Sequence, residues 1–275
     1  MSDAAARIAV GIEYEGSRYA GWQAQPGLLT IQGEIERALA RIADHPVAVV
    51  CAGRTDAGVH ASGQVAHFDT SALRPPHGWV LGANSHLPAA IALRWATPIE
   101  SGFHARYSAL ARSYRYLIVQ GRTRPALLHG RVCHLRATLD AERMQAAGRH
   151  LIGEHDFSAF RGADCQSRSP IRRVDEIRVV ATGPFVVIEV TANAFLHHMV
   201  RNISGTLIAV GSGERPPEWV AEVLATRDRR AAGVTAPAAG LYLVSVRYPD
   251  GAGLPPLAAR QPSAMIAGLA AGWLP

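Results

Sequence analysis

The sequence contains no lysine, has only three cysteines and lacks any long apolar run. The cysteines Cys51, Cys133 and Cys165 lie far apart and form no CxxC pair, which argues against a disulfide framework and a structural zinc site. No stretch approaches the roughly 18 apolar residues that a membrane span needs. Met1–Ala6 carries no basic start followed by an apolar segment, as a signal peptide would. We therefore expect a cytoplasmic protein with no membrane partner.

The composition allows buried cores and favours an anionic partner. The chain has 275 residues, 48% of them hydrophobic, which is enough for one large domain or two smaller ones. Its net charge of +6 and its isoelectric point near 9.7 favour a polyanion such as RNA. All 28 basic residues are arginine, which suits bidentate phosphate contacts. A GC-rich genome also produces lysine-free chains, so the sign of the charge is the more informative feature.

One stretch combines a tight loop with a single carboxylate. Gly53 and Gly58 bracket Arg54-Thr55-Asp56, between an apolar run, Val47–Val50, and an alternating run, Gln64–Thr70. This pattern predicts strand, loop and strand, and the glycines allow positive φ and close approach of a ligand. An aspartate beside an arginine is a candidate nucleophile, because the cation favours the charged carboxylate. The same residues also fit a plain turn between two strands.

Other segments follow strand or helix periodicity. Alternation predicts strands over Arg7–Tyr14, Ile91–Trp95, Arg112–Val119, Gly130–Leu135, Ile171–Val180, Phe185–Ala192 and Leu241–Val246. Helical spacing predicts helices from Thr30 to before Pro46, from Pro75-Pro76, over Leu139–Ile152 and His197–Val210, and from Pro216-Pro217. Glu15–Gly27 reads as a loop rich in glycine and aromatic residues, in which Arg18, Tyr19 and Trp22 are available to a ligand, although Trp22 also suits the end of a core.

The order of these elements is similar in the two halves of the chain. Each half has several strands and one principal amphipathic helix, which predicts two α+β units joined across one mixed sheet with a central cleft. We place the halves at residues 1–105 and 106–250. Residues 251–275 are rich in Ala, Pro and Gly and are expected to form a flexible tail.

Ten residues around the acidic loop, Ala52–Ala61, resemble the signature of the tRNA pseudouridine synthase A (TruA) family. Further matches follow in order from about Ile8 to Pro249, so that the resemblance covers nearly the whole chain. They are Gly16-Ser17, Gly21-Trp22-Gln23, Phe103-His104-Ala105-Arg106, Tyr114-Arg115-Tyr116, His155-Asp156-Phe157, Asn193-Ala194-Phe195, His197–Asn202 and Gly240-Leu241-Tyr242-Leu243.

This resemblance implies a fold and a reaction. The fold is α+β, with two ferredoxin-like (RRM-like) halves joined through one mixed, mainly antiparallel sheet, and only the first half carries the catalytic loop. The reaction isomerises uridine to pseudouridine at positions 38, 39 and 40 of the tRNA anticodon stem-loop, without cofactor or metal. The resemblance also implies a homodimer in which both subunits hold one tRNA.

The resemblance also assigns roles to individual residues. Asp56 matches the nucleophile, Arg201 the arginine that pairs with it, and Tyr114 the tyrosine that stacks on the target base and whose hydroxyl is a candidate proton relay. Leu243 supplies an apolar wall under the uracil, and Arg54 holds or extrudes the nucleotide. By pattern alone, Tyr114 is an ordinary strand residue, Arg201 a solvated helix residue, and Leu243 a core residue.

The segment Ser158–Arg173 is polar, carries several arginines and has no apolar periodicity. We expect these arginines to contact phosphate, which would make tRNA binding depend on salt. They are Arg161, Arg168, Arg172 and Arg173.

Two alternatives to this interpretation are weaker. His197-His198, with His60 and His67, suggests a metal site, but adjacent histidines on a helix point apart and no carboxylate–histidine spacing supports it, so we expect no metal. A non-catalytic RNA-binding protein of this fold would not need Asp56 together with its matched partners. A single-carboxylate hydrolase lacks a second acid near that residue.

Overall fold

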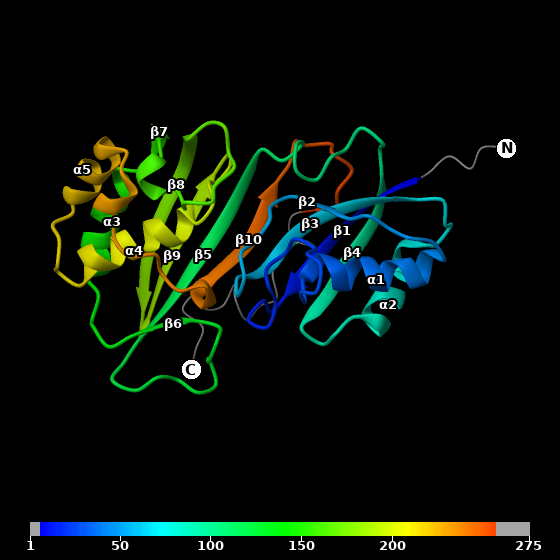
Figure 1. The fold of residues 1–275 in the computed structure, drawn as a ribbon, viewed down its shortest axis with the longest axis horizontal. Helices are drawn as coiled ribbons and strands as arrows, with labels where there is room; N and C mark the ends of the chain where they lie inside the picture. The colour runs from blue at the N-terminus through cyan, green and yellow to red at the C-terminus, as the bar shows by residue number, and fades with distance from the viewer. Residues whose placement is uncertain (1–5, 257–275) are drawn as a thin grey trace. The chain divides into compact units, whose positions relative to one another are not determined.

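The structure is a computed structural model, and residues 6–256 are described (Figure 1). They divide into two compact units, of which the first contains the chain up to Leu110 and again from Leu243, and the second runs from Ala111 to Tyr242. Both units combine strands with helices, so the predicted α+β class is confirmed. The predicted domain ranges, 1–105 and 106–250, stay a prediction. Residues 257–275 of the predicted tail lie outside the described residues.

The first unit contains a sheet with the strand order β4-β1-β3-β10, and β2 pairs with β3. Its elements are β1 (Ala6–Tyr14), α1 (Ile31–Ala43), β2 (Val50–Cys51), β3 (His60–Thr70), α2 (Pro76–His86), β4 (Ile91–Ile99) and the end of β10 (Leu241–Arg247). Strand β1 is antiparallel to both β3 and β4, with Ile8 opposite Phe68. The rings of Phe68 and Trp79 meet edge to face, 5.1 Å apart, where α2 covers this sheet.

The second unit contains the strand order β5-β9-β8-β7, with the short β6 parallel to β5. Its elements are β5 (Ala111–Gln120), β6 (Cys133–Leu135), α3 (Ala141–Arg149), β7 (Gly153–Asp156), β8 (Ile171–Thr182), β9 (Phe185–Ala192), α4 (Met199–Gly211) and α5 (Trp219–Thr226). The β8–β9 hairpin turns at Gly183, whose φ of 54° explains the glycine. Helix α3 packs on β8 and α4, and buries Met144 and Ala147.

The predicted helix after Thr30 is confirmed. The Thr30 hydroxyl accepts a hydrogen bond from the Gly33 amide at 3.3 Å and so satisfies one of the free amides in the first turn of α1. Ile35 and Leu39 are fully buried on the inner face of the helix. The helix ends where Asp44 takes a left-handed conformation, with φ 59°.

Several predicted boundaries are wrong for local reasons. Helix α3 begins at Ala141, later than Leu139, because the Asp140 carboxylate caps it by accepting from the Arg143 amide. Val49 lies outside β2 although it is buried, since Glu36 of α1 accepts from the Val49 amide at 2.9 Å. The Glu36 carboxylate thus takes the place of the carbonyl that a neighbouring strand would offer to the Val49 amide.

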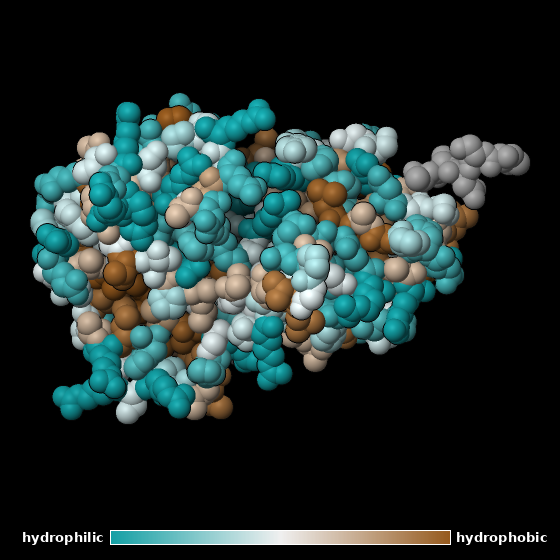
Figure 2. All heavy atoms as spheres, viewed as in Figure 1, coloured by the Kyte–Doolittle hydropathy of each residue, from teal (hydrophilic) through white to brown (hydrophobic). Residues whose placement is uncertain are grey.

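The described part of the chain contains no helix that is long and apolar enough to cross a membrane. On the face drawn in Figure 2, hydrophobic residues form separate patches among hydrophilic ones. The most exposed large apolar side chains are Leu73, Leu127 and Val234, which lie far apart in the sequence. Single exposed apolar residues of this kind are common on protein surfaces.

A buried histidine in the first unit makes stability depend on pH. His67 is 4% exposed and its Nδ1 accepts a hydrogen bond from the Ala105 amide at 3.1 Å. Burial, with Arg7 and His104 nearby, lowers the pKa of His67 to about 4. Because the unfolded chain protonates this side chain more readily, stability is highest above pH 6.5 and falls between pH 6.5 and 4.

We therefore expect the free energy of unfolding to fall by roughly 2–3 kcal/mol through His67 between these pH values. His67→Gln keeps an acceptor for the Ala105 amide but does not titrate. Urea unfolding at pH 7.5, 6 and 5 should show that this variant loses part of the decline seen in the wild type. Parallel declines in the two proteins would contradict the assignment.

Candidate active site

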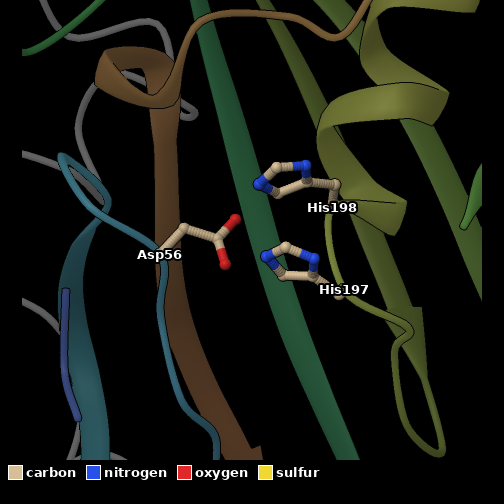
Figure 3. Close-up of side chains that lie close together, drawn as sticks. All are labelled: Asp56, His197 and His198. Atoms are coloured by element: carbon tan, nitrogen blue, oxygen red, sulfur yellow. The ribbon is translucent and has the colours of Figure 1, made fainter. Parts of the chain in front are cut away.

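Asp56 lies in the loop between β2 and β3, half-buried, between the exposed residues Arg54 and Ala57 (Figure 3). The Asp56 carbonyl accepts from the Val59 amide at 3.2 Å, which closes a tight turn around the acid. Gly58 in this turn has φ 78°, as its position predicts. The loop therefore holds the backbone of the carboxylate in one conformation, with the buried Thr55 directly before it and the exposed Ala57 directly after it.

The aromatic loop before α1 packs directly on this turn. The Trp22 amide donates to the Thr55 carbonyl at 3.0 Å, and the Gly58 amide donates to the Tyr19 carbonyl at 3.4 Å. Gly21 has φ 93°, and a Cβ there would lie 2.8 Å from the Thr55 carbonyl oxygen. Trp22 and Tyr19 are buried, so the expectation that their side chains are available to a ligand is wrong, and Trp22 belongs to the core.

Tyr114 lies on β5 in the second unit and is 8% exposed. Its ring meets that of Phe195 edge to face, with centroids 5.0 Å apart and planes at 81°. This contact fixes the plane of the tyrosine ring, as a stacking surface requires. Leu243, on β10, is fully buried, which fits an apolar wall and a core residue equally well.

Arg201 lies in the first turn of α4 and is half-buried rather than fully solvated. Its Nε–H donates to the Ala236 carbonyl at 2.8 Å, and its own carbonyl accepts from the Ala236 amide at 3.1 Å. The guanidinium is thus held at a defined place by the segment that leads to β10.

His197 and His198 precede α4 instead of forming its first turn (Figure 3). His198 has a left-handed backbone, with φ 60°, which a helix interior does not allow. The two imidazole rings stack, with centroids 3.9 Å apart. The argument that adjacent histidines point apart is therefore wrong here, because it assumed a helix. The expectation that the protein binds no metal stays a prediction.

The four arginines expected to bind phosphate differ in their surroundings. Arg161 donates to the carbonyls of Cys165 and Ser167, and Arg172 donates to the Ser169 carbonyl and the Ser167 hydroxyl. These two guanidinium groups brace the loop from inside. Arg168 and Arg173 are exposed, and Arg173 forms an ion pair with Asp175 at 2.8 Å.

Comparison with known proteins decides the family. The family model described as tRNA pseudouridine synthase matches residues 11–108 and 147–249. The chain belongs to the tRNA pseudouridine synthase family. Proteins named tRNA pseudouridine synthase A are similar to it in Aeromonas hydrophila, at 58% identity over 90% of this chain and 93% of the relative, and in Coxiella burnetii, at 58% over 91% and 96%. A relative of the same name in Vibrio cholerae is 56% identical over 90% and 94%.

The resemblance to the tRNA pseudouridine synthase family and the enzyme class, an isomerase that forms pseudouridine, are thus confirmed. The roles of the individual residues stay predictions. Sequence reasoning missed the side chains that support the acidic loop from below, above all Gln64, which is fully buried. No sequence signal singled out Gln64, because the strand also contains His60, Ser62, His67, Asp69 and Thr70.

Proposed function

We propose that this enzyme isomerises uridine to pseudouridine at positions 38, 39 and 40 of the tRNA anticodon stem-loop, with Asp56 as the nucleophile. The observation that carries the proposal is the turn around Asp56, which holds one half-buried carboxylate in the sequence that matches the family signature. A turn that only connects two strands would not need the buried Gln64 beneath it or the hydrogen bonds from the loop that contains Tyr19 and Trp22.

The chemistry requires a charged acid but no co-reactant. The N1–C1′ bond of uridine breaks, the uracil rotates, and C5 bonds to C1′; C5 loses a proton and N1 gains one. Asp56 adds to C6 of the base or acts at C1′, and in both cases an ionised carboxylate must lie against the target. Product and substrate are isomers, so no oxidant or group donor takes part.

We assign the supporting roles to residues that the structure holds rigidly. The guanidinium of Arg201, anchored by Ala236, pairs with Asp56 and keeps it charged and oriented. Tyr114, braced by Phe195, stacks on the extruded base, and its hydroxyl relays a proton. Leu243 forms an apolar wall under the uracil, and the exposed Arg54 holds the displaced nucleotide.

The deciding experiment maps pseudouridine in tRNA incubated with the purified protein. We expect modification at positions 38, 39 and 40, and none in a tRNA whose uridines there are replaced by cytidine. Binding without modification would favour the alternative, an RNA-binding protein of this fold. Modification at other positions would contradict the proposed site specificity while leaving the reaction intact.

We further propose that the enzyme acts in the cytoplasm as a homodimer that binds one tRNA across both subunits. The family resemblance and the basic charge of the chain support this assembly. Light scattering of the purified protein, alone and with tRNA, should give two chains per tRNA. A monomer that retains full activity at all concentrations would contradict it.

The exposed arginines of this loop should contribute to the salt dependence of tRNA binding. The plot of log affinity against log salt has a negative slope. We expect Arg168→Gln/Arg173→Gln to make this slope shallower by roughly 1.5, since each lost phosphate contact contributes about 0.7–0.9. The matched control is Arg178→Gln, an exposed arginine on β8 outside this loop. Filter binding across a salt series measures the slopes of the double variant and of the control. Equal slopes in these two proteins would show that Arg168 and Arg173 do not contact phosphate.

A further inference from the structure

A buried polar network lies beneath the Asp56 loop. Gln64 on β3 is fully buried, Tyr14 on β1 is 2% exposed and Thr55 is 7% exposed. The Gln64 Nε2 donates to the Gly53 carbonyl at 2.7 Å, and its Oε1 accepts from the Gly53 amide at 3.4 Å. One primary amide therefore satisfies both backbone groups of Gly53, where the β2–β3 pairing ends at the Ala52 amide.

A second branch of the network reaches the residue immediately before the acid. The same Gln64 Nε2 lies 3.5 Å from the Tyr14 hydroxyl, which lies 2.8 Å from the Thr55 hydroxyl. Because an amide nitrogen can only donate, the Tyr14 oxygen accepts from Gln64, while either hydroxyl can donate in the bond between Tyr14 and Thr55. The ring of Trp22 packs against Tyr14, with centroids 5.9 Å apart.

We propose that Tyr14, Thr55 and Gln64 are positioning residues, which set the orientation of Asp56 by fixing the loop at Gly53 and Thr55. This inference rests on the proposed role of Asp56. The three side chains act on the loop, because they hydrogen-bond to Gly53 and to one another. Polar groups at such depth are costly unless they are paired, and a fully satisfied network fixes a single geometry.

The effect of removing one hydroxyl should appear in the rate of the chemical step. A displacement of about 1 Å at a reacting group costs roughly 10²-fold in rate. We expect Tyr14→Phe and Thr55→Val each to lower the single-turnover rate by about this factor. Affinity for tRNA should stay within roughly twofold, since binding is spread over many phosphate contacts. Thr55→Ser, which keeps the hydroxyl, should restore most of the rate.

The control variant is Tyr248→Phe. The Tyr248 hydroxyl also donates from a buried position in the first unit, to the Ala105 carbonyl at 2.7 Å, and Ala105 lies outside the Asp56 loop. It should lose thermal stability as Tyr14→Phe does and keep the wild-type single-turnover rate. The double variant Tyr14→Phe/Thr55→Val should be no slower than the slower of the two single variants, because each single variant already lacks the bond between Tyr14 and Thr55.

Single-turnover assays on an anticodon-arm RNA, with binding titrations and melting curves, test this proposal. A multiplicative loss in the double variant, or a wild-type rate in Thr55→Val, would overturn the positioning role. A wild-type enzyme that forms no pseudouridine in the same assay would instead overturn the proposed function. The two failures are therefore distinguishable.

Discussion

We expect Asp56→Asn to abolish pseudouridine formation while tRNA affinity stays within a few-fold of the wild type. Asparagine keeps the size of the side chain, and the turn that holds residue 56 uses its backbone carbonyl, so the loop should keep its shape. It has no anionic oxygen, and loss of a nucleophile costs on the order of 10⁴-fold or more. Affinity should survive, because phosphate contacts dominate RNA binding.

The measurement is a single-turnover assay beside a binding titration on the same preparation. Asp69→Asn is a matched control, since that carboxylate lies in the same unit and forms an ion pair with Arg7 at 2.7 Å. The control should lose a little stability and no activity. Activity near the wild type in Asp56→Asn would show that another group performs the reaction.

The second large effect is expected at Tyr114. Tyr114→Phe keeps the ring and its edge contact with Phe195, so that binding should be normal, and loss of the hydroxyl should slow turnover by about 10–10²-fold. Tyr114→Ala also removes the stacking surface, which is worth roughly 1–3 kcal/mol per base. The alanine variant should therefore be slower still and should place the base poorly.

Tyr116→Phe is the control for both variants. Tyr116 lies two residues further along β5, is fully buried, and donates its hydroxyl to the Pro237 carbonyl at 2.8 Å. Its loss should lower the melting temperature without changing the rate per folded enzyme. Wild-type turnover in Tyr114→Phe would remove the hydroxyl from the mechanism, and equal rates in the Ala and Phe variants would remove the stacking.

Sequence patterns predicted the elements whose side chains alternate clearly between inside and outside. Helix α1 is an example, because its buried side chains share one face. Strand β1 was predicted from the alternation in its sequence, although all residues from Ile8 to Ile12 are buried. Strand β7, of four residues Gly153–Asp156, has no apolar alternation and was not predicted. The late start of β2, at Val50 instead of Val47, depends on Glu36, a contact between segments that no local pattern contains.

The same limit applies to the candidate site. A short motif located the Asp56 loop, because a glycine-bracketed acid is visible in consecutive residues. The bond between Tyr14 and Thr55 joins positions 41 apart and depends on strand register, so it could not be predicted from spacing. The bracing roles of Arg161 and Arg172 were missed because a charged residue in a polar loop is usually solvated.

The placement of β10 has a consequence for synthesis of the chain. In the first unit, β3 lies beside β10, and a Cβ on Gly63 would come within 2.0 Å of the Val244 carbonyl oxygen. The ribosome makes β3 long before Leu243–Arg247 emerges, so the nascent first unit has an unpaired strand edge while the whole second unit is translated. Unpaired edges promote aggregation. The sheet of the amino-terminal half is therefore completed only by one of the last strands to be translated.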